Sequence, residues 1–279
     1  MPSLSRFLQD YRKNARLILN SYNNPLKNPE NLSKKDVLEK DFYDGLAEKY
    51  IDHFDEDIFR YDPNEKFPLS HQYFYSLLEN IEGKNILDCC CGYGFTSINL
   101  AKRGANVWGV DISPKMIRIA QQNAAYNEVG DRVNQQVMSV QEMEFADNMF
   151  DFAVAIGGLH HLNLDLAGKE IARVLKPGGK AIFIEPRLPF RWLVFLRSLF
   201  PNKCYESPGG GQLEDNDIAH FGKYFSNTHI QYFLFLRKLA RFPIISKFSD
   251  HLDRLDVRLI RYFPFLKYFY FAFVLEFRK

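Results

Sequence analysis

The sequence predicts an α/β fold built on a mostly parallel sheet with helices on both faces. Apolar strand-like segments alternate with helix-length segments from residue 85 to residue 185. The stretch ILDCCCGYG, from Ile86 to Gly94, delivers an apolar strand into a glycine turn. The next apolar run, 107–110, ends at Asp111. A strand, a glycine turn, a helix, a second strand and an acid together predict a βαβ unit that binds a nucleotide-type ligand.

Seven strands are expected, each a short apolar run rich in β-branched or aromatic residues and bounded by turn residues. The fifth follows the turn residues KPGG, and the sixth follows a short helix after three acidic residues, Glu214, Asp215 and Asp217. The seventh closes the sheet. The predicted ranges are 85–90, 106–111, 132–138, 150–156, 180–185, 228–234 and 268–277.

Three helices of the predicted core have recognisable ends. One spans 96–103, directly after the glycine turn. Ser113 and Pro114 open a second helix over 115–127, because serine caps a helix and proline fits its first turn. A third begins near Leu166 and stops at the KPGG run, 176–179, which cannot continue a helix.

Helical patterns also flank the core. Apolar residues recur at helical spacing over 4–19, and a second pattern covers 36–54. After the sixth strand, an amphipathic repeat over 252–263 ends at Pro264. We therefore divide the chain into an N-terminal helical roof (1–82), a core (83–235), an aromatic-rich helical cap inserted before the last strand (236–267) and the final core strand (268–279).

Composition narrows the function classes. The chain has 279 residues, 46% hydrophobic content and a net charge of +2, which fits a protein with a sizeable core and gives no footprint for nucleic acid. Apolar runs stay below the length of a membrane span and the N-terminus lacks a signal-peptide core, so a cytoplasmic protein is expected. Of four cysteines, Cys89, Cys90 and Cys91 are consecutive and Cys204 stands apart. We expect them to be reduced, with no metal site.

The stretch from about Phe42 to Pro186 resembles the class I S-adenosylmethionine-dependent methyltransferases. Within that class, its motifs most resemble those of the quinone-biosynthesis branch. The resemblance covers roughly half the chain and rests on blocks that occur in the family's order. These are Phe42, Tyr43 and Asp44 with Ala47 and Tyr50; Asp88 to Gly94; GVDISPKMI, which contains Asp111; EMEFADNMFDFAV; LHHL; EIARVLKPGG; and Glu185 with Pro186. The resemblance implies a Rossmann-like, seven-stranded fold and S-adenosylmethionine as the cofactor.

The resemblance also implies roles for the residues of the cofactor site. Asp88 would hold the ammonium group, the backbone of the turn that contains Cys90, Gly92 and Gly94 would face the carboxylate and ribose, and Asp111 would take the ribose hydroxyls. The remaining cofactor-binding candidates are Ile112 against the adenine, Ser139 and Val140 at its edge, and Tyr50, with Tyr43, offering a ring to the sulfonium. Packing between helices is the alternative role for both tyrosines.

Two residues depart from the family pattern. Cys90 stands where the family has its first glycine, so the turn must admit a thiol. Ser139 stands where many members place an acid that faces the adenine amino group, and a hydroxyl accepts that hydrogen bond more weakly than a carboxylate does.

His160, at the end of the fourth strand, is the first candidate for a catalytic base, because imidazole titrates near neutral pH. Glu185, which ends the fifth strand, is the second candidate, either as the base or as an anchor for the acceptor. A structural role for His160 and His161, shaping the loop, is the competing interpretation.

The acceptor is expected to be small and apolar or lipid-linked, with oxygen or carbon methylated. A glycan precursor or a nitrogen acceptor is the alternative within the class. A catalytically inactive cofactor-binding protein and a nicotinamide-dependent oxidoreductase are the alternatives outside it, although Ser97 occupies the place of the third glycine of the dinucleotide pattern. Residues 157–160, GGLH, lack the motif of enzymes that methylate flipped bases, so no nucleic-acid partner is expected.

The cap holds eight basic residues between Arg237 and Lys267 and three aspartates. Cations beside large apolar side chains fit peripheral contact with an anionic membrane surface. Packing of the apolar stripe on the sheet, with a solvated charged face, is the alternative. The sequence leaves the oligomeric state open.

Overall fold

A computed structural model describes residues 29–52, 61–62, 67–187, 211–233, 236, 249–263, 265–266 and 272–279. The predicted helical pattern over 4–19 and the isolated Cys204 lie outside the described residues. Two compact units are present. Among the described residues, the first contains 29–62 and 81–145, and the second contains 67–80, 146–187 and the residues from 211 onward.

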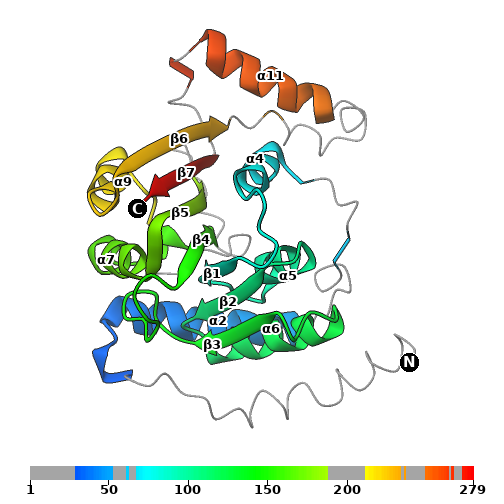
Figure 1. Cartoon of the computed structure of the whole chain (residues 1–279), viewed down its shortest axis with the longest axis vertical. Coiled ribbons are helices and arrows are strands. Elements are labelled where there is room, and N and C mark those ends of the chain that lie inside the picture. The colour runs from blue at the N-terminus through cyan, green and yellow to red at the C-terminus, as the bar shows by residue number, and fades with distance from the viewer. Residues whose placement is uncertain are drawn as a thin grey trace. The chain divides into compact units, whose positions relative to one another are not determined.

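The seven predicted strands are confirmed (Figure 1). They are β1 (Asn85–Cys89), β2 (Asn106–Asp111), β3 (Val133–Val137), β4 (Phe150–Ile156), β5 (Leu175–Pro186), β6 (Asn227–Phe233) and β7 (Ala272–Arg278). They follow the order β3-β2-β1-β4-β5-β7-β6 in one sheet. Strand β1 is parallel to β2, β2 to β3 and β4 to β5, whereas β7 is antiparallel to β5 and β6. The sheet is therefore mostly parallel, as the sequence predicts.

In the first unit, β1 is buried along residues 86–89, which explains why it reads as a continuous apolar run rather than an alternating one. Helices α5 (Phe95–Lys102) and α6 (Pro114–Tyr126) connect the strands. Ser113 caps α6 as predicted, because its side chain accepts a hydrogen bond from the Met116 amide at 3.1 Å. Helix α2 (Lys34–Asp52) confirms the helical pattern predicted over 36–54 and packs along α6 (Figure 1). A short 3-10 turn, η1 (Pro29–Asn31), precedes it.

In the second unit, α4 (Leu69–Leu77) packs on β5 and β7, and α7 (Leu164–Val174) packs against β5. The 3-10 turn η2 (Leu159–His161) follows β4, and α9 (Asp215–Gly222) contacts α7. The core contains fully buried phenylalanines: the ring of Phe221 lies 5.7 Å from that of Phe183 and 5.0 Å from that of Phe277. These rings join α9 to β5 and β7.

The start of β5 differs from the prediction. The fifth strand was expected from 180, after a turn at 176–179, but β5 begins at Leu175. The register with β4 shifts between Phe150 and Phe152, and Gly178 has φ of +76°. The predicted turn before the strand is therefore wrong. The KPGG residues form an irregular segment within β5, where Gly178 adopts the left-handed backbone that glycine permits.

Helix α11 (Ser249–Tyr262) lies between β6 and β7 in the sequence and confirms the predicted helical insertion before the last strand. Within the described ranges, no helix is both long enough and apolar enough to cross a membrane.

Candidate functional site

The glycine loop after β1 turns tightly because three of its residues adopt left-handed backbone conformations. Cys90 has φ of +55°, Gly92 of +52° and Gly94 of +86°. Two backbone hydrogen bonds hold the turn, from the Cys91 amide to the Val110 carbonyl (3.0 Å) and from the Gly94 amide to the Cys91 carbonyl (2.9 Å). Gly94 is the N-cap of α5, so the loop ends where the positive end of a helix begins.

Asp111 ties this loop to the loop after β2. Its Oδ2 accepts a hydrogen bond from the Gly92 amide at 2.9 Å, and its Oδ1 accepts one from the Ser113 amide at 2.9 Å. The side chain is 7% exposed. One carboxylate thus fixes the spacing of two loops at the carboxyl ends of β1 and β2, the edge at which parallel α/β sheets bind ligands.

The two loop glycines differ in what surrounds them. A Cβ added to Gly92 would meet no atom within 4 Å, so this position borders open space. A Cβ added to Gly94 would lie 2.7 Å from Gln135 Nε2, 3.0 Å from Ala120 Cβ and 3.2 Å from Ala120 Cα, on α6. Gly92 therefore borders open space, whereas Gly94 lets α5 and α6 approach each other.

This difference predicts different outcomes for Gly92→Ala and Gly94→Ala. Both substitutions impose a left-handed backbone on alanine, at about 1 kcal/mol. Only Gly94→Ala also overpacks the interior, so we expect it to lower the free energy of unfolding by about 3 kcal/mol in total, against about 1 kcal/mol for Gly92→Ala. Urea unfolding of the two variants measures this difference. Equal losses of stability would contradict the assignment of Gly94 to packing.

Asp88, at the carboxyl end of β1, lies beneath the loop. The side chain is 1% exposed, and Ser97 Oγ on α5 donates a hydrogen bond to its Oδ2 at 2.6 Å. Burial raises the pKa of Asp88 to about 7, and the nearby charge of Asp111 adds to the rise, while the bond from Ser97 opposes it. In this conformation the carboxyl group anchors the first turn of α5.

The raised pKa of Asp88 makes stability depend on pH. The folded state keeps a proton that the unfolded chain releases near pH 4, so this contribution to stability is complete below about pH 4 and is lost as pH rises through about 7. We expect the wild type to lose up to about 1.4 kcal/mol per pH unit across this window relative to Asp88→Asn. Urea unfolding from pH 5 to pH 8 gives both slopes. Parallel slopes for the two proteins would show that Asp88 does not titrate in this window.

The three consecutive cysteines are free thiols. Cys89 and Cys91 are buried, and burial raises the pKa of each well above its usual range, so both favour the thiol form. Cys90 is half-buried and occupies the left-handed position at the head of the loop. The turn therefore forms with a thiol where the family pattern has glycine.

Helix α2 brings both predicted tyrosines to the loop. Tyr43 and Tyr50 pack against buried Leu46 and Ala47. Tyr50 also makes an edge contact with the ring of Tyr93, with centroids 5.6 Å apart. Burial raises the pKa of Tyr43 above its ordinary value, and the charges of Asp111, Glu39 and Cys90 add to the rise. Helix packing thus accounts for part of the burial of both tyrosines.

Asp44 has a structural role that the motif alone does not reveal. Its Oδ1 accepts hydrogen bonds from Ser113 Oγ at 2.6 Å and from the Lys115 amide at 3.3 Å, and its Oδ2 pairs with Lys40 at 3.0 Å. Asp44 therefore fastens α2 to the N-terminus of α6, beside the loop that Asp111 holds. The only sequence signal for this role is that Asp44 belongs to the motif Phe42-Tyr43-Asp44.

A second set of bonds fastens the start of α2 to the loop after β3. Gln141 Nε2 donates to Asp36 Oδ1 at 2.8 Å, and Asn31 Nδ2 donates to Glu142 Oε2 at 3.0 Å. These pairs join residues about a hundred positions apart and have no local sequence signal.

The predicted adenine residues lie in the same unit. Ile112 is half-buried and packs against Cys91, Ile117 and Val137. Val140 is 3% exposed, and Ser139 is half-buried, with its Oγ accepting a hydrogen bond from the Gln141 amide at 3.2 Å. The first unit therefore contains all nine predicted cofactor-binding residues, at the carboxyl ends of β1 and β2, in the loops that follow β1, β2 and β3, and on α2.

The two predicted catalytic residues form a pair in the second unit. His160 Nδ1, on η2, lies 2.6 Å from Glu185 Oε2 on β5, and the Leu159 amide donates to Glu185 Oε1 at 2.7 Å. The side chain of Glu185 is fully buried, and that of His160 is 10% exposed. The rings of His160 and His161 lie 3.9 Å apart. Because a carboxylate only accepts, the pair selects the tautomer that carries its proton on Nδ1.

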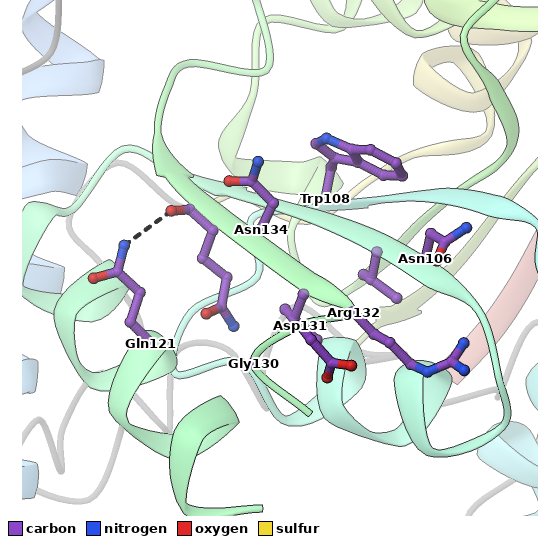
Figure 2. A pocket seen from close by; sticks show the side chains of 10 residues that line it. Asn106, Trp108, Gln121, Gly130, Asp131, Arg132 and Asn134 are labelled. Atoms are coloured by element: carbon purple, nitrogen blue, oxygen red, sulfur yellow. Dashed lines mark hydrogen bonds between the residues drawn. The ribbon is translucent and has the colours of Figure 1, made fainter. Parts of the chain in front are cut away.

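A separate groove of about 560 Å³ lies at the amino ends of β2 and β3 (Figure 2). Figure 2 shows Trp108 and Asn134 along one side, and Gln121 donating to the Gln135 carbonyl at 3.0 Å. Asp111 lies at the opposite end of β2, so this groove is distinct from the predicted cofactor cradle. Among the residues that the structure covers, no cluster of three potential metal ligands is present.

Comparisons with known proteins agree with this geometry. Residues 86–179, which contain the glycine loop, Asp111 and His160, match a family model described as a methyltransferase domain. The chain is 40% identical over 116 residues to a sterol 4-C-methyltransferase of Caenorhabditis elegans, a match that covers 41% of this chain and 35% of that relative. It is 28% identical over 193 residues to a demethylmenaquinone methyltransferase of Bacillus licheniformis, covering 66% of this chain and 75% of the relative.

Solved structures share the fold. A phosphoethanolamine N-methyltransferase of Haemonchus contortus superposes with a TM-score of 0.56 at 19% identity, covering 90% of this chain and 60% of that one. A geranyl diphosphate C-methyltransferase of Streptomyces coelicolor superposes with a TM-score of 0.54 at 16% identity, covering 76% and 77%. With the ordered motifs and the strand order, these findings show a methyltransferase domain over residues 86–179 and a fold shared with solved methyltransferases.

Proposed function

We propose that this protein transfers a methyl group from S-adenosylmethionine to an oxygen or carbon atom of a small apolar acceptor. The observation that carries the proposal is the preformed cradle, in which Asp111 binds the amides of Gly92 and Ser113 and Gly92 borders open space. Backbone amides, a helix N-terminus and a carboxylate match the carboxylate and ribose hydroxyls of this cofactor. The residues present therefore fit the group.

The proposed binding roles follow from these contacts. The loop that contains Cys90, Gly92 and Gly94 would hold the amino acid portion and the ribose, and Asp111 would accept bonds from the ribose hydroxyls. Ile112, Ser139 and Val140 would border the adenine. Asp88 would contribute negative charge toward the ammonium group from beneath the loop while it keeps Ser97 in place.

The bound cofactor supplies a sulfonium methyl group that is already activated for in-line displacement. The protein therefore has to align the acceptor and exclude water rather than generate a strong electrophile. Tyr43 and Tyr50, held by α2, would cover the cradle and offer ring faces to the sulfonium charge. The Asp44 contacts with Ser113 and Lys115 keep that helix in register with the cradle.

We further propose that His160 accepts the proton of a hydroxyl or an acidic carbon on the acceptor, and that Glu185 positions it. Glu185 was a candidate base in its own right, but it is fully buried and both its oxygens are engaged, by His160 and by the Leu159 amide. Holding the proton on Nδ1 directs the lone pair to Nε2, which suits a base.

The apolar acceptor class is supported by the relatives, whose names specify a sterol and demethylmenaquinone. We extend these classes to the present chain as a proposal, because the chain spans 35% of the sterol methyltransferase.

Two experiments test the proposal. Calorimetry should show binding of S-adenosylmethionine and no binding of a nicotinamide dinucleotide. Purified protein with methyl-labelled cofactor should then label a prenylated hydroquinone or a sterol, while an ethanolamine phosphate and a sugar nucleotide serve as nitrogen and glycan acceptors. Binding of the dinucleotide alone would overturn the cofactor assignment, and exclusive labelling of the amine or the sugar would overturn the acceptor class.

A further inference from the structure

Helix α11 presents one face to the protein and another to solvent. It packs beside β6, the last strand in the sheet order (Figure 1). Asp256 on its inner face is 4% exposed, and its Oδ2 accepts a hydrogen bond from the Leu236 amide at 3.3 Å. This acid, which the sequence places among the basic residues of the cap, is therefore turned away from the outer surface.

The outer surface of α11 and of the residues after it is unusually apolar. Leu255 is 44% exposed, Tyr262 is 72% exposed, Phe263 is 49% exposed and Phe265 is 58% exposed. Within the described residues, four of the seven exposed large hydrophobic side chains thus fall in the short stretch 255–265. The other three are distributed over α2 and α7.

Exposed cations lie beside these side chains. Arg254, Arg258 and Arg261 are exposed, and at about 3.6 residues per turn their spacing places them on one face of α11. Leu255 and Tyr262 occupy the adjacent strip of the same helix. Among the side chains that the structure describes, none forms an ion pair with these three arginines. The outer face thus combines exposed guanidinium groups with aliphatic and aromatic side chains.

We propose that this outer face, Arg254, Arg258 and Arg261 with Leu255, Tyr262 and Phe263, docks on an anionic lipid bilayer. Long cationic side chains reach phosphate groups while leucine and aromatic rings enter the boundary between headgroups and acyl chains. The positive charges of these three arginines are complementary to anionic phospholipid. The inference does not depend on methyl transfer, and its test uses neither cofactor nor acceptor.

Flotation of the full-length protein with vesicles tests the proposal. We expect it to float with phosphatidylcholine vesicles that contain roughly 30% phosphatidylglycerol, to float poorly with phosphatidylcholine alone, and to dissociate as salt screens the charges. The triple variant Arg254→Gln, Arg258→Gln, Arg261→Gln should bind the anionic vesicles roughly a hundredfold more weakly. Leu255→Ser with Tyr262→Ser should also weaken binding, because it removes the inserted apolar area.

The matched control carries Leu166→Ser and Lys169→Gln on α7, where Leu166 is 51% exposed and Lys169 is also exposed. This variant removes the same kinds of side chain elsewhere and should float like the wild type. Thermal unfolding by circular dichroism should show that the α11 variants remain folded. Flotation that is absent for the wild type, or unchanged in the arginine variant, would overturn the proposal. So would light scattering that shows a dimer lost in the α11 variants, because the face would then bind a second copy of the chain.

Discussion

Asp111→Ala is expected to lower the affinity for S-adenosylmethionine at least a hundredfold. The substitution removes the acceptor of both the Gly92 amide and the Ser113 amide, so the loops after β1 and β2 lose their common anchor. It also removes the carboxylate proposed to bind the ribose. Hydrogen bonds to a charged group contribute about 1.5–3 kcal/mol each. Losing the two proposed bonds from the ribose hydroxyls therefore corresponds to a hundredfold loss of affinity or more. Titration calorimetry of the wild type and the variant measures it.

Two further variants separate the effect of the Asp111 charge on cofactor affinity from the effect of removing any acidic side chain. Asp111→Asn keeps an oxygen that can accept from one amide but loses the negative charge, so its affinity should fall between those of the wild type and the alanine variant. Asp131→Ala removes an exposed carboxylate in the same unit and should bind normally. Unchanged affinity in Asp111→Ala, with folding verified by circular dichroism, would remove Asp111 from the cofactor site.

His160→Ala is expected to lower kcat by roughly a hundredfold to ten-thousandfold on an acceptor hydroxyl or acidic carbon, the usual contribution of a positioned base. The cofactor should bind with unchanged affinity, because all the proposed cofactor contacts belong to other residues. Rates of methyl transfer to the prenylated hydroquinone, together with calorimetry for S-adenosylmethionine, give both quantities. A variant with full turnover would leave His160 with the structural role that its contact with His161 also supports.

Glu185→Gln tests whether Glu185 acts through His160. The glutamine oxygen can still accept from the Leu159 amide, so the buried hydrogen bond that holds η2 is retained. Its amide group, however, would donate to His160 Nδ1 and favour the tautomer with the proton on Nε2. Turnover should therefore fall nearly as far as in His160→Ala.

The double variant shows whether His160 and Glu185 act as one catalytic unit or contribute independently to turnover. His160→Ala combined with Glu185→Gln should be no slower than His160→Ala alone, because Glu185 has no role once the imidazole is gone. Multiplicative losses would instead show that Glu185 acts on the acceptor by itself.

Much of the fold was predictable because its signals are local. Strands β2 and β4 have the predicted bounds, and the Ser113 cap of α6 forms as expected, because burial patterns and caps depend on residues close together in the chain. The start of β5 was less accurate. Whether the KPGG residues precede the strand or belong to it depends on pairing with β4, which the sequence does not specify.

The candidate site shows a similar division. The motifs predicted the residues of the proposed cofactor site, but they did not predict the connections between them. Asp44 bonds Ser113 across almost seventy positions, and Gln141 bonds Asp36 across more than a hundred. Such contacts have no spacing that a reader of one sequence could recognise, because they form only when helices and loops pack together.

By itself, the sequence determined the element order, the glycine turn and the acid that closes the second strand, because these features depend on short segments with their own backbone preferences. Its motifs also carry the resemblance to methyltransferases. Only the tertiary structure decided that Asp88 is buried against Ser97, that Glu185 holds His160, and that α11 turns Asp256 inward and its arginines outward. The physical reason is that burial and charge pairing are properties of a packed environment. A residue acquires them from neighbours that are distant in the chain.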